Sequence, residues 1–488
     1  MLFNSIDFLI FFPIVTLLFF IIPGRLRTLW LLIASYYFYM SWNPRYAILI
    51  ALSTVTTFIS GILIAKMEKP VSKKLVVAAS LLINLAILGI FKYADFALQT
   101  LSSIAQHLGL GTIDKRLDLL LPVGISFYTF QALSYTLDVY RGTIRAEKSL
   151  LRYALFVSFF PQLVAGPIER SGNLLGQIQT IRTRRLWDYD RVRDGLLLMF
   201  WGLFQKLVIA DRASILVDQV YGNYTDYGFL ELAIASVLFA FQIYCDFGGY
   251  TNIARGAAQV MGFSLMQNFR QPYLAITIKD FWRRWHISLT SWFTDYLYIP
   301  LGGSRKGLLR QYVNIFIVFG VSGLWHGASW HFVAWGLLHA VYQIVGNAKS
   351  RIIKRLHPKA EEIRCSFSQK LGKGIITFAL VDFAWIFFAA DNLHQVLGIL
   401  RQMLTAFQLS SVYDLGLDRG NWFMLVTAIC ILFMVDVIHE SGKSVFRLVS
   451  RQTLWFRWIL YLGLIWCTIL FGIYGVEYDS SQFIYFQF

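Results

Sequence analysis

The sequence predicts an all-helical protein that crosses a membrane many times. Of its 488 residues, 57% are hydrophobic and only 15% are charged, whereas about a quarter of the residues in a soluble domain are charged. Long apolar runs recur along the whole chain, and basic residues gather in alternate connections between them. We therefore expect about eleven transmembrane helices, with further re-entrant or interfacial helices, because a helix satisfies its backbone groups within each span.

The apolar runs have lengths that suit membrane-spanning helices. They cover residues 8–22, 29–40, 46–65, 75–90, 196–210, 230–244, 312–320, 375–390, 422–437 and 458–474. Since roughly 20 residues of helix cross the hydrocarbon core, the shorter runs are expected to tilt or to enter and leave on one side. Asp7 stands just before the first run and no basic residue precedes it, which indicates a retained span rather than a signal peptide.

The chain shows no division into separate parts. It contains neither an internal repeat nor a long linker rich in glycine, serine or proline. Residues 1–488 are therefore expected to form a single membrane domain, and a repeat-built transporter is disfavoured.

The positive net charge of +16 follows the topology of the spans. Basic residues cluster at 25–27, 66–74, 141–152, 170–193, 349–355 and 443–451, and the connections between these clusters are poorer in them. Cytoplasmic connections are the ones enriched in lysine and arginine, so both termini are expected to be extracytoplasmic. Topology and membrane lipid account for the charge, and we expect no nucleic-acid partner.

Polar residues interrupt the apolar runs in the middle of the chain. Residues 156–171 are broken by prolines and a glycine, which fits a re-entrant element and a kinked interfacial helix equally well. Residues 244–263 contain Asp246, a carboxylate that must be paired or face water in a membrane. A structural ion pair with Arg255 is the favoured explanation for Asp246.

Residues 280–307 are too amphipathic to span a membrane. They contain Arg283, Arg284, His286 and Asp295 among several tryptophans and tyrosines. Such residues anchor helices at the headgroup level, and the two arginines could also receive an anionic ligand from the cytoplasm. The sequence PLGGSRKG then forms a basic turn, but it lacks the Lys-Ser/Thr order of a nucleotide-binding P-loop.

Three histidines lie in the apolar stretch VSGLWHGASWHFVAWGLLHA. A metal site at His326 and His331 is disfavoured, because five residues on one helix point about 140° apart and no glutamate stands between them. For His331 and His339 a hydrogen-bonded core position is favoured. General acid–base chemistry remains for His326. Whether residues 311–346 cross the membrane twice or bend back is left open.

Four stretches together resemble the membrane-bound O-acyltransferase family. They are FFPQLVAGPIER, YCDFGGYTNIARG, FWRRWHISLTSWFTDYLYIPLGGSRKG and SGLWHGASWHFVAWGLLH. The resemblance covers nearly the whole chain and extends to the bacterial branch that acetylates alginate or peptidoglycan or transfers D-alanine to teichoic acid.

The resemblance implies a central tunnel through a bacterial inner-membrane protein. In this tunnel, a hydroxyl acceptor from the outer side would meet a thioester from the cytoplasm. The thioester would be acetyl-CoA or an acylated carrier protein. His326 matches the essential histidine and is expected to be the general base, since a hydroxyl is a poor nucleophile without one. His286 matches the second functional position. Trp325 is expected to shape the pocket. Asp295 and Asp246 are second-rank candidates for the site, and a structural role is favoured for each.

The acceptor is less well defined than the reaction. An extracytoplasmic polysaccharide such as alginate or peptidoglycan, reached directly or through a partner acetyltransferase, is the favoured acceptor. D-alanyl transfer and lipid acylation would use the same chemistry. A transporter and a non-catalytic scaffold remain as alternatives from other classes, and no bound cofactor or metal is expected.

Overall fold

The structure, a computed structural model, describes residues 1–111, 116–164, 166–356, 366–407, 415–474 and 484. These residues form helices and connections, as the sequence predicted, and they divide into two compact units. One unit comprises residues 1–199 and 253–266, and the other comprises residues 200–252 and 267–488. Two helices, α10 (Tyr189–Leu203) and α12 (Phe229–Val260), run from one unit into the other.

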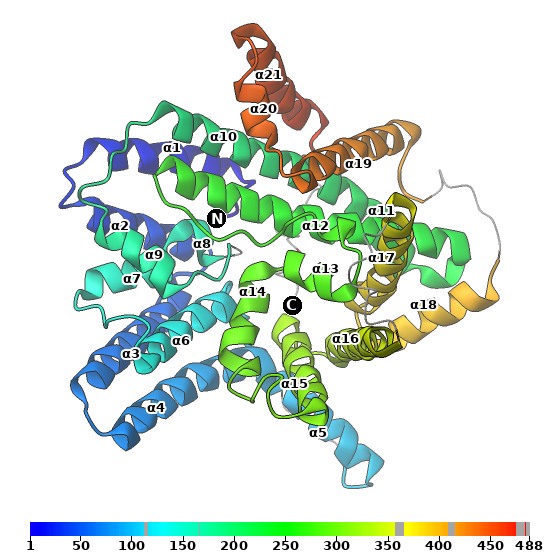
Figure 1. Cartoon of the computed structure of the whole chain (residues 1–488), viewed down its shortest axis with the longest axis horizontal. Coiled ribbons are helices and arrows are strands. Elements are labelled where there is room, and N and C mark those ends of the chain that lie inside the picture. Colours follow the sequence, from blue (N-terminus) through cyan, green and yellow to red (C-terminus); the bar gives the residue numbers. More distant parts are fainter. Residues whose placement is uncertain (112–115, 165, 357–365, 408–414, 475–483, 485–488) are drawn as a thin grey trace. The chain divides into compact units, whose positions relative to one another are not determined.

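Nine helices belong wholly to the first unit within the described residues (Figure 1). They are α1 (Ile6–Ile21), α2 (Arg27–Met40), α3 (Ala47–Lys66), α4 (Pro70–Leu88), α5 (Ala94–His107), α6 (Ile125–Arg141), α7 (Leu150–Ser158), α8 (Phe160–Leu163) and α9 (Ser171–Gln179). Helix α4 passes into α5 through a π-helical turn, Gly89–Tyr93. The break between α7 and α8 falls in the proline-containing stretch 156–171, whose membrane placement stays a prediction.

Helix α6 is the centre of the first unit. Thirteen of its 17 residues are buried, so it has no solvent- or lipid-facing side of any size. It packs against α3 and α4, and its polar side chains are hydrogen-bonded: Gln131 donates to the carbonyl of Phe156 at 2.6 Å, and Thr136 lies 3.4 Å from Ser80. Small polar groups paired in this way hold helices together where lipid removes the hydrophobic drive.

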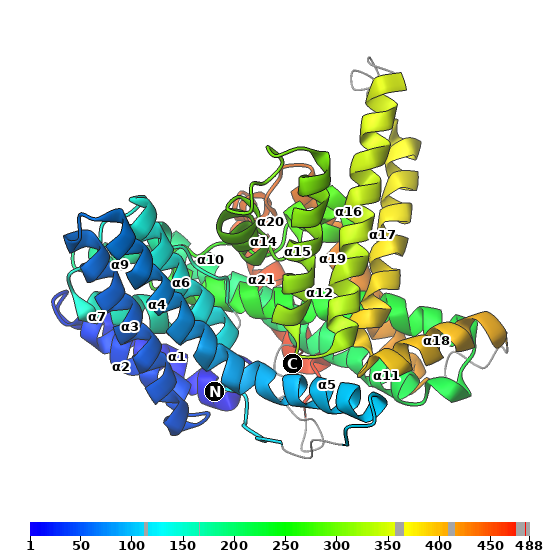
Figure 2. The same cartoon turned by 90° about the horizontal axis from the view of Figure 1, so that it is seen from below.

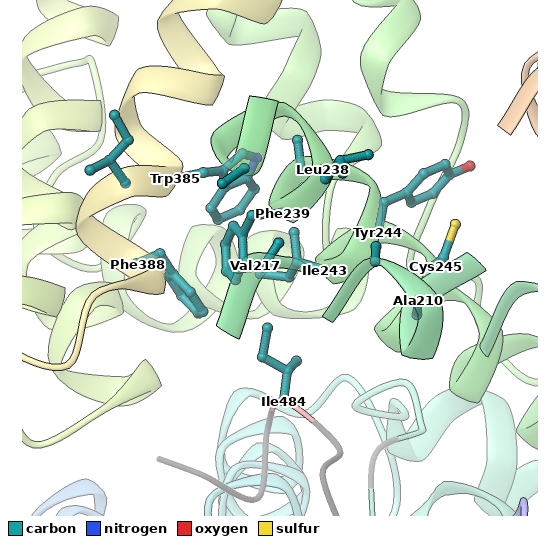
Figure 3. Close-up of a cluster of buried hydrophobic side chains, with 14 of the residues drawn as sticks. Ala210, Val217, Leu238, Phe239, Ile243, Tyr244, Cys245, Trp385, Phe388 and Ile484 are labelled. Carbon is teal, nitrogen blue, oxygen red and sulfur yellow. The ribbon is translucent and has the colours of Figure 1, made fainter. Parts of the chain in front are cut away.

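The second unit contains the remaining helices and the stretch with the candidate residues. Its elements are the π-helix η3 (Phe204–Ala210), α11 (Asp211–Gly222), α13 (Ile278–Arg284), α14 (Ile287–Phe293), the π-helix η6 (Thr294–Tyr298), α15 (Leu308–His326), α16 (Trp330–Leu356), α17 (Phe367–Ala389), α18 (Leu393–Thr405), α19 (Arg419–Glu440), α20 (Val445–Ser450) and α21 (Leu454–Phe471). Its core is rich in aromatic rings, and Figure 3 shows Trp385 and Phe388 beside Phe239, with Ile484 in the same cluster.

Seven helices in the described residues are long and apolar enough to cross a membrane. They are Pro44–Lys66, Pro70–His107, Phe229–Val260, Leu308–His326, Phe367–Ala389, Arg419–Glu440 and Leu454–Phe471, and the shorter Ile6–Ile21 is also apolar. The protein is therefore a multi-pass membrane protein. The count of about eleven spans and the single domain over residues 1–488 stay predictions.

The stretch 311–346 is a helical hairpin. Helix α15 ends at His326 and α16 begins at Trp330, and the two helices lie side by side with α17 next to α16 (Figure 2). Two glycines permit the close approach: a Cβ at Gly323 would lie 2.3 Å from the carbonyl oxygen of Phe332, and one at Gly336 would lie 2.2 Å from that of Phe319. The hairpin brings the two ends of this stretch together, since Arg351 donates to the side-chain oxygen of Gln311 at 2.9 Å.

We expect Gly336→Ala to separate α15 from α16 and to lower the yield of folded protein. A methyl group cannot occupy the space of a backbone oxygen, and overpacking of this kind costs about 1–3 kcal/mol or more. The measurement is monodispersity and thermal stability in detergent. Gly346→Ala, on the same helix with no heavy atom within 4 Å of its added Cβ, is the control. Equal behaviour of the two variants would contradict the close packing.

Candidate active site

The structure brings His286 and His326 together. The centroids of their imidazole rings are 6.2 Å apart, although 40 residues separate them in the chain. Trp325 is the third member of the cluster, with its ring 5.8 Å from His286 and 5.0 Å from His326. All three side chains are buried. Three of the residues predicted from the sequence therefore lie in one buried cluster, between the start of α14 and the end of α15.

The backbone at His286 is held in a left-handed conformation. Its φ of 43° and ψ of 53° cost a residue with a side chain on the order of 1 kcal/mol. Hydrogen bonds on both sides maintain it: the N–H of Ile287 donates to the carbonyl of Asn268 at 2.9 Å, and the N–H of Arg270 donates to that of Arg284, also at 2.9 Å. Strained backbone of this kind is concentrated at functional sites.

A buried polar trio supports the same turn, and the sequence did not reveal it. Ser288 donates to the side-chain oxygen of Asn268 at 2.6 Å, and the amide of Asn268 donates to the hydroxyl of Thr251 at 3.1 Å. All three side chains are buried. Their partners are 17 and 20 residues apart in sequence, so only the folded chain shows the arrangement. The trio fixes the position from which His286 projects.

The ring of His286 is uncharged at neutral pH. It lies between α13 and α14, outside the candidate spans, and burial lowers the pKa of His286 to about 3. The ring of Phe247 covers it, with centroids 4.7 Å apart. A neutral imidazole has one donor and one acceptor nitrogen, so His286 can position a polar group without carrying a charge.

His326 is enclosed by aromatic rings. Trp335 lies 5.0 Å and Phe388 lies 5.4 Å from its ring centroid. It is the last residue of α15, and the chain turns at Gly327, where a Cβ would come within 2.1 Å of the ring of Phe332. The glycine therefore allows the helix to end directly at the imidazole.

A cavity of about 380 Å³ lies beside the histidine pair. It is formed by α13, α14, α15 and α16, and its lining includes Trp282, Phe319 and the two charged residues Lys279 and Arg283. The histidines do not line it, but Leu289 of α14 and Ser322 of α15 do, each within about one helical turn of them. The lining of the cavity therefore comes within about one helical turn of each histidine along the chain.

The basic turn that follows η6 extends this cationic surface. A second cavity, of about 490 Å³, is lined by residues 298–300 and 302–306 and shares Tyr298 and Ser304 with the first. It adds Arg305 and Lys306 to the charged lining residues. The charged residues that line the two cavities are all cations, so the pair of cavities suits an anionic ligand with a less polar arm.

Arg284 lies elsewhere than the predicted ligand site. Its guanidinium donates to Asp280 at 3.0 Å and to both carboxylate oxygens of Glu440 at 2.6 and 3.0 Å, and it does not line either cavity. With these donors engaged, its geometry favours a structural link between α13 and α19. Asp295 is half-buried on η6 and also lies outside both linings.

The expected ion pair between Asp246 and Arg255 is wrong. Both residues lie on α12, where nine residues separate them by about 13 Å along the axis. Asp246 instead pairs with Lys206 of η3 at 2.7 Å, and the same ammonium contacts Asp211 at 2.8 Å. All three side chains are buried, and the backbone N–H of Ile484 also donates to Asp246 at 2.8 Å. Asp246 therefore belongs to a buried charge cluster.

Contrary to the prediction from the sequence, His326 and His331 do not share one helix, because α15 ends at His326 and α16 begins at Trp330. His331 is the second residue of α16, and its Nδ1 lies 2.9 Å from the carbonyl oxygen of Phe387, which confirms a hydrogen-bonded core position. Within the part of the chain that the structure describes, no three His, Cys, Asp or Glu residues are grouped to hold a metal ion.

Fold and site together define a multi-pass membrane protein with a buried histidine pair beside a cationic cavity, and comparison with known sequences gives the family. The sequence model of the membrane-bound O-acyltransferase family matches residues 144–372. The chain is 35% identical over 435 residues to the peptidoglycan O-acetyltransferase of Helicobacter pylori, covering 83% of this chain and 80% of the relative. The chain belongs to the membrane-bound O-acyltransferase family.

Two further relatives define the range of the similarity. The probable alginate O-acetylase AlgI of Pseudomonas putida is 37% identical over 402 residues, which is 81% of this chain and 78% of that protein. The teichoic acid D-alanyltransferase of Bacillus subtilis is 26% identical over 279 residues, which is 56% of this chain and 69% of that protein. The two O-acetylating relatives therefore match more of the chain at higher identity.

Proposed function

We propose that this protein transfers an acetyl group from a cytoplasmic thioester to a hydroxyl group of an extracytoplasmic polysaccharide. The observation that carries the proposal is the buried pair of His286 and His326, 6.2 Å apart beside a cavity whose charged lining residues are cations. The similarity to O-acetylating relatives, over 83% and 81% of this chain, supports the acetyl group and the polymer acceptor. Residues 1–488 act together as one domain in this proposal.

The donor is a thioester that carries phosphate, either acetyl-CoA or an acylated carrier protein. Lys279 and Arg283 in the first cavity and Arg305 and Lys306 in the second would bind the phosphates. The cavity of about 380 Å³ would hold the uncharged arm that ends in the thioester. The side of the membrane that bears these residues is then the cytoplasm, and both termini are extracytoplasmic in the bacterial inner membrane.

The transfer needs a base at the acceptor hydroxyl. The hydroxyl oxygen attacks the thioester carbonyl carbon while His326 takes its proton. The carbon–sulfur bond then breaks, and the leaving thiolate takes the proton back from the imidazolium, which leaves an ester and a free thiol. His286, neutral and fixed by its turn, would donate a hydrogen bond where negative charge develops on the carbonyl oxygen.

The test of this function is transfer of radiolabelled acetyl groups in proteoliposomes. We would offer acetyl-CoA or an acetylated carrier protein outside inverted vesicles, with polysaccharide and the extracytoplasmic partner acetyltransferase inside. Label on the polymer or partner supports the proposal. If the acetyl donors give no label but a carrier protein loaded with radiolabelled D-alanine does, the result would support the D-alanyl alternative that the Bacillus relative suggests. If no thioester gives label while the partner acetyltransferase still binds, the protein is a non-catalytic scaffold and the proposed function is wrong.

We expect Arg283→Gln to raise the KM for the donor by about tenfold with little change in kcat. A charge-assisted hydrogen bond to phosphate is lost in both the ground state and the transition state, so binding is affected more than chemistry. Donor titration in the vesicle assay measures this.

Lys69→Gln is the control, because Lys69 is an exposed lysine in the connection before α4. A lower kcat for Arg283→Gln at unchanged KM would contradict the assignment of Arg283 to donor binding.

A further inference from the structure

His339 is a buried histidine that the proposed transfer does not use. It lies on α16 with no exposed surface, and its Nδ1 is 3.3 Å from the indole nitrogen of Trp282. An indole N–H can only donate, so Nδ1 of His339 is the acceptor and the proton of the neutral ring is on Nε2. The hydrogen bond therefore fixes both the tautomer of His339 and the direction of the indole.

The indole of Trp282 is part of the wall of the 380 Å³ cavity. His339 meets it edge-on, with ring centroids 5.0 Å apart at 86°, and Phe319, which also lines the cavity, lies 5.2 Å from it at 73°. Behind this wall, Trp335 contacts Trp282 at 5.8 Å and His326 at 5.0 Å. One aromatic cluster therefore joins the cavity wall to the candidate base.

We propose that His339 is a positioning residue for the donor cavity, which it shapes by accepting the hydrogen bond of Trp282. The inference rests on the proposed function, since it takes the cavity as the site of the thioester arm. With the acceptor in place, the indole has one orientation and the cavity one shape. Without it, a buried indole N–H loses its partner and the ring turns to find another.

A packing role for His339 makes the opposite prediction from a hydrogen-bonding role. Asparagine places an oxygen acceptor near the position of Nδ1 but fills less space. Phenylalanine fills the space of the imidazole ring but accepts no hydrogen bond. If hydrogen bonding matters, His339→Asn should bind the thioester donor better than His339→Phe. If only packing matters, His339→Phe should bind it better.

The experiment measures donor kinetics of both variants in the vesicle assay. We expect His339→Phe to raise the KM for acetyl-CoA by at least about fivefold with a smaller effect on kcat, and His339→Asn to stay within about twofold of the parent. The change Trp282→Phe removes the indole N–H that donates the hydrogen bond. Adding His339→Phe to it should therefore change the KM for acetyl-CoA little further. The reversed ranking, or full additivity of the two changes, would overturn the inference.

A second readout separates this inference from the proposed function. Protein labelled with 15N at the tryptophan indoles gives one signal that disappears in Trp282→Phe and so identifies Trp282. That signal should shift in His339→Phe and stay near its place in His339→Asn. If these shifts appear but the parent transfers acetyl groups from no thioester, the proposed function fails while the hydrogen bond stands. If the parent is active and the Trp282 indole signal shifts in neither His339 variant, the positioning role of His339 is wrong.

Discussion

Replacing His326 by glutamine should reduce acetyl transfer by at least about a hundredfold, because general-base catalysis contributes about 10²–10⁴ in rate. Glutamine keeps a polar group of similar length at the end of α15 but cannot take a proton at neutral pH. The aromatic rings of Trp335 and Phe388 that enclose the position remain in place. The protein should therefore stay folded while the reaction is lost. The measurement is single-turnover transfer of radiolabelled acetyl groups at saturating donor.

The control for His326→Gln is another histidine of the same unit. His394 is exposed on α18, so His394→Ala should transfer at the parent rate. Both variants must reach the membrane in equal amount and elute as the parent does in detergent. Near-parental transfer by His326→Gln under these conditions would show that His326 is not the base. His286 would then be the remaining candidate of the pair.

Removing Lys206 should destabilise the protein far more than removing one of its two carboxylate partners. Lys206→Met leaves Asp246 and Asp211 buried without the ammonium that contacts both, and breaking a buried pair in this way costs about 3–5 kcal/mol. Asp246→Asn keeps an oxygen for the N–H of Ile484 and leaves the contact between Lys206 and Asp211. Thermal unfolding in detergent should therefore rank Lys206→Met well below Asp246→Asn.

This ranking also tests the role of Asp246 in catalysis. If Asp246 serves only the charge cluster, Asp246→Asn should transfer acetyl groups at a rate that follows its folded fraction. Equal stability of the two variants would contradict the cluster. A large loss of transfer in fully folded Asp246→Asn would return Asp246 to the candidate catalytic residues.

The sequence predicted the elements that depend on local pattern. Apolar runs indicated the spans, and the motifs around His286 and His326 indicated two histidines that the structure places in one buried cluster. Each of these signals is contained in a short stretch of chain. The end of α15 was harder, because the apolar pattern continues through His326 and into α16, and only Gly327 marks the turn.

The pairing of charges could not be predicted in the same way. Asp246 pairs with Lys206, 40 residues earlier, rather than with a residue of its own helix, and Arg284 binds Glu440, which is 156 residues away. Asn268, Ser288 and Thr251 likewise meet only because three separate segments converge. Such partners are selected by tertiary packing, since any buried charge needs a partner but its sequence does not say which one.

The left-handed backbone at His286 affects how substitutions there must be interpreted. Position 286 carries two separate requirements, one on the side chain and one on the φ angle, and alanine fails both. Asparagine adopts this conformation more readily than most residues, so it isolates the loss of the imidazole. Glycine at 286 would relax the backbone as well. Glycine and alanine both lack the imidazole, so the difference between these two variants measures how much of this enzyme's activity depends on the φ angle of one residue.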